Sequence, residues 1–281
     1  MATDVETSAI DLSIVLPCYR AATLAHRSVA VLSEYLGSWT GRWEIIVVDD
    51  GGGDFDDDAF AGAPRVHLIR LPHNLGKGAA VSTGMLVARG GVRIFTDIDL
   101  PYDCDLLLAI AAVIHERGFH LVVGDRTLST SSYAADIGFP RRAASALFST
   151  FVGTLVTGGF FDTQCGLKGV RGDVADELFR LVRIHRFAFD VEVIYLALKH
   201  RLDIHRIPVQ LRNNETSSIR LLRDATRGVI DIARIKWHQM TGCYESRLLE
   251  DLVSREFDQV RESATAAMPS KPEQVAGHVI R

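Results

Sequence analysis

Short runs rich in β-branched residues alternate with longer helical stretches, and this order restricts the fold more than any other feature. Strands that alternate with helices predict a mostly parallel sheet with helices on both of its faces. We therefore expect an α/β, Rossmann-like fold. The expected strands are Leu12–Pro17, Glu44–Asp49, Val66–Leu71, Arg93–Thr96 and Leu121–Gly124, and the expected helices between them are Thr23–Leu36, Gly76–Ala88 and Leu106–Glu116.

The second half of the chain is richer in helical patterns. The expected elements are a helix-rich region over Arg141–Val156, a loop over Phe161–Gly169, helices near Asp173–Leu181 and Asp190–Lys199, a strand over Asp203–Val209 and a last helix over Ser218–Met240. Beyond it the sequence becomes polar, which predicts a partly disordered C-terminal extension. We expect a flexible N-terminus over residues 1–10, one domain over 11–243 and the extension over 244–281.

The composition is that of a globular protein, with 47% hydrophobic and 23% charged residues among 281. The four cysteines lie far apart without a Cys-x-x-Cys pair, which argues against a disulfide framework and a zinc site. No apolar run approaches the roughly 18 residues of a membrane span, and the acidic N-terminus is no signal peptide. These features predict a cytoplasmic protein with at most peripheral contact at the inner membrane face.

Charge is distributed unevenly along the chain. Residues 1–116 are net acidic and residues 117–236 are net basic. An acidic half suited to a cation and a basic half suited to phosphate fit a phosphate-handling enzyme, and nothing indicates nucleic-acid binding.

Two acidic pairs follow predicted strands. Asp97-Ile98-Asp99 comes directly after the apolar run Val92–Phe95, and Asp49-Asp50 ends another such run. Carboxylates at the carboxyl ends of buried strands point into the crevice where open α/β sheets bind ligands. Oxygen ligands spaced as Asp-x-Asp suit Mg²⁺ or Mn²⁺, which one or two carboxylates commonly hold together with substrate phosphates. The pattern predicts a metal–diphosphate site.

Three further segments favour a nucleotide ligand. Pro17 ends the first strand, where we expect it to stop the ladder and to turn the backbone into the crevice. Gly51-Gly52-Gly53 after the Asp49-Asp50 pair would allow close approach of a base or ribose. Lys77 lies between glycines at the start of a predicted helix, where it can meet a phosphate, although the P-loop pattern is absent.

Together these motifs resemble the catalytic domain of family 2 glycosyltransferases, which has the GT-A fold. The shared elements are the early Pro-x-Tyr, Val-Val-Asp-Asp-Gly, Asn-x-Gly-Lys-Gly and the Asp-x-Asp. The segments Phe161–Lys168 and Arg186–Glu192 are similar to the polyprenyl-phosphate (dolichyl-phosphate) branch, most of all to its glucosyl type. The resemblance covers residues 11–240, with the motifs in the same order.

The resemblance implies a role for each matching residue. Nucleotide-sugar contacts would come from Pro17, Tyr19, Asp49, Asp50, Lys77, Asp97, Asp190 and Glu192. Asp97 and Asp99 would hold Mg²⁺ or Mn²⁺. The catalytic residues would be Asp162, Arg126 and Lys168, and the acceptor would meet Arg126, Arg141, Gln164 and Arg220.

The chain also departs from the family pattern. Gly51-Gly52-Gly53 stands where the family often has Gly-Ser, and Tyr19-Arg20-Ala21 lacks the usual Asn-Glu. Dolichyl members often carry membrane helices, whereas this sequence has no such segment. A basic helical face predicts instead that the last helix holds a phosphate or lies on an anionic bilayer, and it consists of Arg220, Arg223, Arg227 and Arg234.

The reaction implied is an inverting transfer of a hexose from a nucleotide-diphosphate sugar, with UDP-glucose favoured over GDP-mannose. The acceptor stays open. A polyprenyl phosphate is already ionised near neutral pH, so that positioning arginines such as Arg126 would matter more than a base. A hydroxyl on a small molecule or glycan needs a general base, for which Asp162 is the candidate.

Two other classes of function remain as alternatives. An aspartyl-nucleophile phosphatase also carries Asp-x-Asp after a strand, but it needs the motif on the first strand of its domain, and three predicted strands precede Asp97. A catalytically inactive sugar-nucleotide binding module would not need the two intact acidic pairs.

Overall fold

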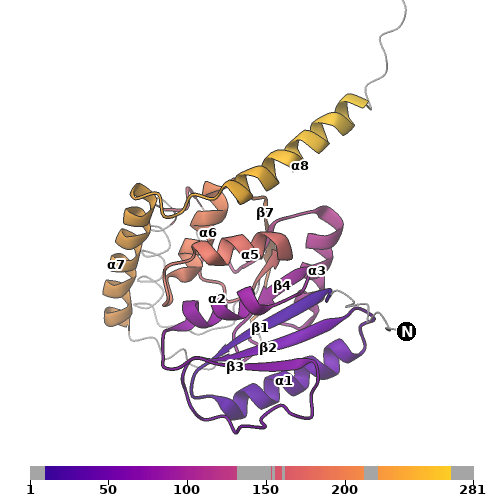
Figure 1. Ribbon diagram of the computed structural model, residues 1–281, viewed down its shortest axis with the longest axis vertical. Coiled ribbons are helices and arrows are strands. Elements are labelled where there is room, and N and C mark those ends of the chain that lie inside the picture. The colour runs from indigo at the N-terminus through magenta and orange to yellow at the C-terminus, as the bar shows by residue number, and fades with distance from the viewer. Residues whose placement is uncertain (1–9, 132–152, 154–155, 160–161, 212–220, 267–281) are drawn as a thin grey trace, which may run out of the picture. The chain divides into compact units, whose positions relative to one another are not determined.

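The computed structural model describes residues 10–131, 153, 156–159, 162–211 and 221–266 (Figure 1). The chain divides into two compact units, residues 1–245 and 246–281. The first unit contains the sheet and every predicted site residue that the structure describes. Most of the predicted helix-rich region over Arg141–Val156 lies outside the described residues, as do residues 218–220 at the expected start of the last helix.

The first unit is built on a mixed sheet of seven strands in the order β3-β2-β1-β4-β6-β5-β7. Four of the six neighbouring pairs are parallel, as expected from an alternating chain, whereas β6 runs antiparallel to both β4 and β5. The predicted mostly parallel sheet is confirmed. The strands are β1 Leu12–Cys18, β2 Trp43–Asp49, β3 Val66–Arg70, β4 Val92–Phe95, β5 Leu121–Asp125, β6 Lys168–Arg171 and β7 Ile204–Pro208.

Strand β6 corrects the end of the loop predicted over Phe161–Gly169, because the strand already begins at Lys168. Its four residues begin and end with a cation and contain a glycine, so local β-propensity gives no signal. The strand forms because it is inserted between β4 and β5, and Lys168 is paired with Phe95 on one side and Val123 on the other. Both partners lie more than 40 residues away, and pairing of this kind cannot be inferred from a local pattern.

Helices cover both faces of the sheet, as expected. Alternation along β1 directs Leu12, Ile14 and Leu16 into a core shared with the buried sides of α1 (Ala22–Gly37) and α3 (Asp105–Arg117). The opposite face carries α2 (Lys77–Val87), α5 (Gly172–Leu181) and α6 (Phe189–Lys199), and Figure 1 shows these three on the other side of the sheet from α1. There the ring of Phe95 packs against Phe179 of α5 and Phe189 of α6.

Two long helices complete the described chain. Helix α7 (Leu221–Met240) belongs to the first unit and α8 (Arg247–Ala266) to the second. Helix α8 occupies much of the extension for which the sequence predicted only polar, partly disordered chain. The signal for it is local: the Ser246 hydroxyl caps the first turn by accepting from Leu249 N at 3.3 Å. None of the helices in the described ranges is long and apolar enough to cross a bilayer.

Candidate active site

Strands β1, β2, β4 and β5 run in the same direction, so their carboxyl ends meet at one edge of the sheet. In register, Cys18 lies beside Asp49, and Val15 lies beside Phe95, two residues before Asp97. The crevice at this edge is where open α/β sheets bind ligands. The structure therefore brings together the motifs that are scattered along the first half of the sequence.

Pro17 does not end its strand, which corrects the expected stop of the ladder. Strand β1 remains paired with β2 through Cys18, but its pairing with β4 ends at Val15, whose carbonyl accepts from Thr96 N. Since successive residues face alternate neighbours, the Pro17 nitrogen faces the side where β4 has already ended. The missing N–H therefore costs no ladder bond. Beyond it, Tyr19 is exposed at the sheet edge, beneath the Arg20 guanidinium.

Asp49 and Asp50 are buried, and both carboxylates accept hydrogen bonds from backbone amides. Asp49 accepts from Gly52 N at 2.7 Å and Gly53 N at 3.2 Å, which folds the glycine turn back onto the strand end. Asp50 accepts from Leu75 N at 2.7 Å and Gly76 N at 2.9 Å. Carboxylate oxygens can accept further bonds, so contact with a nucleotide stays a prediction for both residues.

Helix α2 begins at Lys77 and directs its ammonium to the Asp-x-Asp motif. Lys77 Nζ lies 2.5 Å from Asp97 Oδ1, and Asp97 is about one-third exposed (36%). Burial lowers the pKa of Lys77, but the charges of Asp97 and Asp190 raise it by more, so the ammonium stays protonated. Two motifs 20 residues apart in the sequence thus form one ion pair.

The Asp-x-Asp pair fits a divalent cation that shares its ligands with a substrate. Asp97 and Asp99 offer carboxylate oxygens and are both partly exposed. Among the described residues, no group of three or more His, Cys, Asp or Glu side chains surrounds a single position for a metal. Mg²⁺ and Mn²⁺ accept such partial sets, because waters and phosphate oxygens complete the shell. The donor chemistry therefore suits these ions, provided that a diphosphate binds with them.

On the other side of the crevice, Arg126 and Asp162 form a bidentate ion pair. Arg126 follows β5, and its Nε and Nη2 donate to Asp162 Oδ2 at 3.0 Å and Oδ1 at 2.6 Å. The Arg126 backbone N–H donates to the same carboxylate at 2.7 Å. Burial would raise the pKa of Asp162, but Arg126 lowers it by more, and the net shift is downward. A carboxylate held in this way is a weak base.

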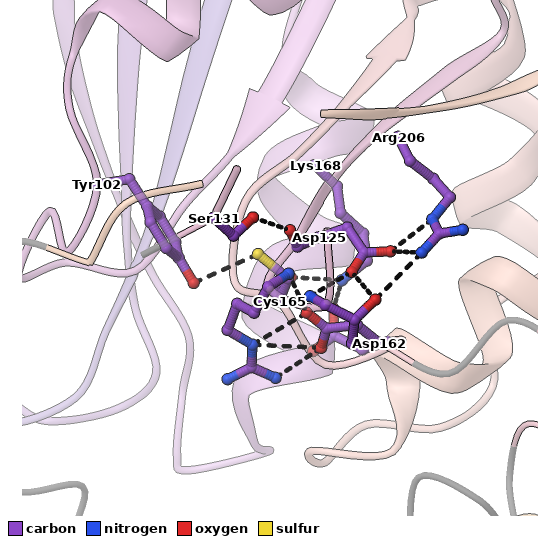
Figure 2. A network of polar contacts seen from close by, with 10 residues as sticks. Tyr102, Asp125, Ser131, Asp162, Cys165, Lys168 and Arg206 are labelled. Carbon is purple, nitrogen blue, oxygen red and sulfur yellow. Dashed lines mark hydrogen bonds and ion pairs between the residues drawn. The ribbon is translucent and has the colours of Figure 1, made fainter. Parts of the chain in front are cut away.

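Lys168 and Asp190 form a second ion pair, which is buried. The Lys168 ammonium, on β6, donates to the Asp190 carboxylate in the first turn of α6 and to Cys165 O at 2.7 Å. Figure 2 shows Lys168 behind Cys165 and Asp162. Neither partner has appreciable exposed surface, with Lys168 at 0%. The pair joins β6 to α6, and the catalytic role predicted for Lys168 stays a prediction.

Glu192 is also buried, and its bonds are internal. Its carboxylate accepts from Arg183 N at 2.9 Å, from Ile184 N at 2.7 Å and from the Tyr244 hydroxyl. Burial raises the pKa of Glu192 above its ordinary value. These bonds fix the segment between α5 and α6, so the predicted contact with a sugar finds no support in this arrangement. Gln164 is exposed, whereas Arg141 and Arg220 lie outside the described residues.

Asp125 and Arg206 belong to the site, although sequence reasoning did not identify them. The buried Asp125 carboxylate accepts from Arg206 Nε at 2.5 Å and from Thr127 N at 2.7 Å. Ser131 closes the turn by donating from its hydroxyl to Asp125 O at 2.6 Å (Figure 2). This network fixes the segment that carries Arg126. No local pattern indicates this network, because Arg206 lies on β7, which pairs with β5, and is 81 residues from Asp125 in the sequence.

The two sides of the crevice are joined by the loop before β6. A Cβ on Gly166 would lie 2.1 Å from Asp97 Oδ2, so only glycine allows the loop to approach the carboxylate this closely. Next to it, Cys165 Sγ lies 3.3 Å from the Tyr102 hydroxyl (Figure 2). The loop that carries Asp162 therefore also approaches the Asp-x-Asp motif.

Similar solved structures show which fold this is. Mannosyl-3-phosphoglycerate synthase from Rubrobacter xylanophilus is similar, with a TM-score of 0.53 and 14% identity over 94% of this chain and 78% of that chain. Glucosyl-3-phosphoglycerate synthase from Mycobacterium tuberculosis, solved with UDP, has a TM-score of 0.57 and 18% identity over 81% and 80%. The fold is that of GT-A glycosyltransferases, as predicted.

Sequence relatives place the chain within that class. Residues 13–178 match the model of Glycosyl transferase family 2, and the chain belongs to this family. It is 30% identical to the dolichyl-phosphate beta-glucosyltransferase of Drosophila melanogaster, over 73% of this chain and 68% of the relative. It is 28% identical to that of Dictyostelium discoideum, over 84% and 77%, and 27% identical to the human enzyme, over 74% and 69%. The protein is a glycosyltransferase.

Proposed function

We propose that this glycosyltransferase moves glucose from UDP-glucose to a polyprenyl phosphate, with inversion at the anomeric carbon. The relatives named as dolichyl-phosphate beta-glucosyltransferases support the sugar and the acceptor class. The observation that carries the acceptor is the pairing of Asp162 with Arg126. Because this pairing lowers the pKa of Asp162, the site favours an acceptor that needs no base over a hydroxyl.

On the donor side, Asp97 and Asp99 would hold Mg²⁺ or Mn²⁺ together with the diphosphate. UDP and Mn²⁺ in a crystal of the M. tuberculosis neighbour agree with this assignment. The bound ion would neutralise the charge of the leaving diphosphate. Lys77, at the start of α2, would add a second positive charge near the same oxygens. Asp49 and its glycine turn would shape the wall against which the base lies.

On the acceptor side, Arg126 would hold the lipid phosphate in line with the anomeric carbon. Its Nε and Nη2 donate to Asp162, which fixes the orientation of the guanidinium that would meet the phosphate. The phosphate oxygen attacks, the bond from the anomeric carbon to the diphosphate breaks, and no proton has to be removed. Positioning then supplies most of the catalysis.

The alternatives from other classes fit less well. An aspartyl-nucleophile phosphatase does not agree with membership in a glycosyltransferase family, and Asp97 follows β4, the fourth strand along the chain. An inactive binding module would need neither the Asp-x-Asp motif beside Lys77 nor the Arg126–Asp162 pair.

The test is a panel of UDP- and GDP-linked sugars with Mg²⁺ or Mn²⁺, with and without a short polyprenyl phosphate. We expect transfer from UDP-glucose that requires both the metal ion and the lipid phosphate. Free polyprenol is the matched control, because it has the same chain but ends in a hydroxyl. Transfer confined to hydroxyl acceptors would refute the proposed acceptor, and transfer from GDP-mannose alone would refute the donor.

We also infer that α7 rests on an anionic bilayer, and we propose a peripheral contact with the cytoplasmic face of the inner membrane. Ile230, Trp237 and Met240 share one side of α7 and are 54%, 62% and 74% exposed, whereas Ile232 and Ile235 on the other side are buried. An exposed apolar side with Trp and neighbouring basic residues is typical of interfacial helices. Ile230→Ser should weaken sedimentation with phosphatidylglycerol vesicles. Val31→Ser, at a similarly exposed valine of α1, should not, and equal binding of both variants would refute the contact.

A further inference from the structure

Lys77 forms an ion pair with Asp97, one of the two carboxylates that would hold a metal ion. Its Nζ lies 2.5 Å from Asp97 Oδ1, and the charges of Asp99 and Asp190 act on the same ammonium. The other oxygen of Asp97 faces Gly166, where the loop approaches so closely that a Cβ would clash at 2.1 Å. Oδ1 is therefore the oxygen that points into the site, and Lys77 already neutralises it.

The backbone that carries Lys77 is fixed from two sides. The Asp50 carboxylate accepts from the amides of Leu75 and Gly76, directly before the lysine. On the far side, Ala79 N donates to His185 O at 3.1 Å. Gly76 has a φ of +111°, and a Cβ there would lie 2.5 Å from His185 O, so the turn into α2 requires glycine. The start of α2 cannot withdraw from Asp97, but the flexible lysine stem can redirect its ammonium.

We propose that Lys77 is a resident counter-ion of the Asp-x-Asp motif, which keeps the free protein from binding a divalent cation tightly and moves to the nucleotide diphosphate when the two ligands bind together. The reason is electrostatic. Two cations on one carboxylate oxygen repel each other, whereas a diphosphate offers the ammonium a new and more highly charged partner. The inference rests on the proposed function only in requiring a nucleotide diphosphate as ligand.

One consequence is positive coupling between metal ion and nucleotide. Each ligand should raise the affinity for the other. The diphosphate draws Lys77 away from Asp97 and so favours the metal ion, and the metal ion on Asp97 frees Lys77 for the diphosphate. Lys77 is a positioning residue in this scheme. A merely structural lysine would not affect the affinity for a metal ion in the absence of nucleotide.

The experiment measures Mn²⁺ binding to the full chain, without and with UDP, by the electron paramagnetic resonance signal of the free ion. Without UDP, Lys77→Met should bind Mn²⁺ about tenfold more tightly than wild type. This factor corresponds to roughly 1.4 kcal/mol, which is a modest share of the interaction energy of a close, partly buried ion pair. Addition of UDP should raise the Mn²⁺ affinity of Lys77→Met by a smaller factor than it raises the Mn²⁺ affinity of the wild type. Lys77→Arg keeps the charge and should behave as wild type does.

Lys199→Met is the matched control, because it removes the same charge from an exposed pair with Glu245 at the end of α6. It should leave Mn²⁺ binding unchanged, and a second neutral variant, Lys77→Gln, should repeat the gain. Unchanged or weaker Mn²⁺ binding by the two neutral variants would overturn the inference, as would an equal gain in Lys77→Arg. None of these measurements uses an acceptor. A protein that gains Mn²⁺ affinity but fails to glucosylate polyprenyl phosphate would refute the proposed acceptor and leave the counter-ion role intact.

Discussion

The donor and acceptor sides of the crevice use their carboxylates in different ways. On the donor side, Asp49 and Asp50 accept from backbone amides, and Asp97 stays partly exposed beside a lysine. On the acceptor side, Asp162 is engaged by an arginine. Below it, Asp190 is engaged by a lysine from another element. The donor side keeps ligand capacity open for a metal ion and a diphosphate, whereas the acceptor side uses its acids to hold cations in place.

The largest expected effect concerns the donor side. Asp99→Asn removes the charge of one of the two carboxylates proposed to hold the metal ion. Among the described residues, no group of three or more His, Cys, Asp or Glu side chains could hold the ion instead. We expect kcat to fall by about 10³-fold, because stabilisation of the leaving diphosphate is the main electrostatic contribution to the reaction. Steady-state kinetics at saturating Mn²⁺ measures this loss. Asp103→Asn, a few residues further along the same segment, serves as the control, and an equal loss in both variants would remove the special role of Asp99.

The next effect concerns the buried pair. Lys168→Met leaves the Asp190 carboxylate buried without its partner, and such changes typically cost about 3–5 kcal/mol of stability. Urea denaturation would measure it. The double variant Lys168→Met/Asp190→Leu should recover much of the loss, since no charge is then left in the core. A double variant less stable than the single one would show that the pair does more than compensate charge.

A smaller effect separates positioning from base catalysis. If Asp162 acts by holding Arg126, then Arg126→Ala and Asp162→Ala should each lower kcat/KM by about 10²-fold, and the double variant should be little worse than either. The cycle is measured with polyprenyl phosphate as acceptor. Additive losses, or a loss in Asp162→Ala that far exceeds the loss in Arg126→Ala, would instead favour a base.

The smallest expected effect is the contribution of Glu192 to the pH dependence of the unfolding free energy. Burial raises the pKa of this carboxyl in the folded protein above its unfolded value, so the protonated form is the one that folding favours. Stability from this source is fully present below the unfolded pKa and is lost as pH rises through the folded pKa. Glu192→Gln should therefore flatten the decline in unfolding free energy above about pH 4.5, measured by denaturation at several pH values. Parallel curves for the two proteins would contradict the assigned shift.

The donor side was largely predictable because its parts are local. Asp49-Asp50, Gly76-Lys77 and Asp97-x-Asp99 each lie at the end of an element with a clear pattern, and the topology of a parallel sheet brings such ends together. The Lys77–Asp97 contact was not predictable in detail, although both residues were assigned to one ligand. It depends on how the turn into α2 is held by Asp50 and His185.

The residues of the acceptor side could be identified from the family resemblance, but their contacts could not be predicted from the sequence. Arg126, Asp162, Lys168 and Asp190 were identified as site residues, yet the ion pairs that they form were not predicted. Arg206 and Asp125 were missed altogether, and β6 was taken for a loop. All of these depend on contacts across tens of residues, for which local propensity carries no information.

The α/β fold and the family could be predicted from the sequence, as could the carboxylates proposed to face the ligand, because strand periodicity, turn glycines and strand-end acids are patterns of a few residues. Only the tertiary structure shows which cation each acid meets and how exposed the pair is. Asp97 is paired with Lys77 but stays partly exposed, whereas Asp162 is buried against Arg126. The reason is that the strength of a base or a metal ligand depends on the charges within a few ångströms of it, and those charges come from distant parts of the chain.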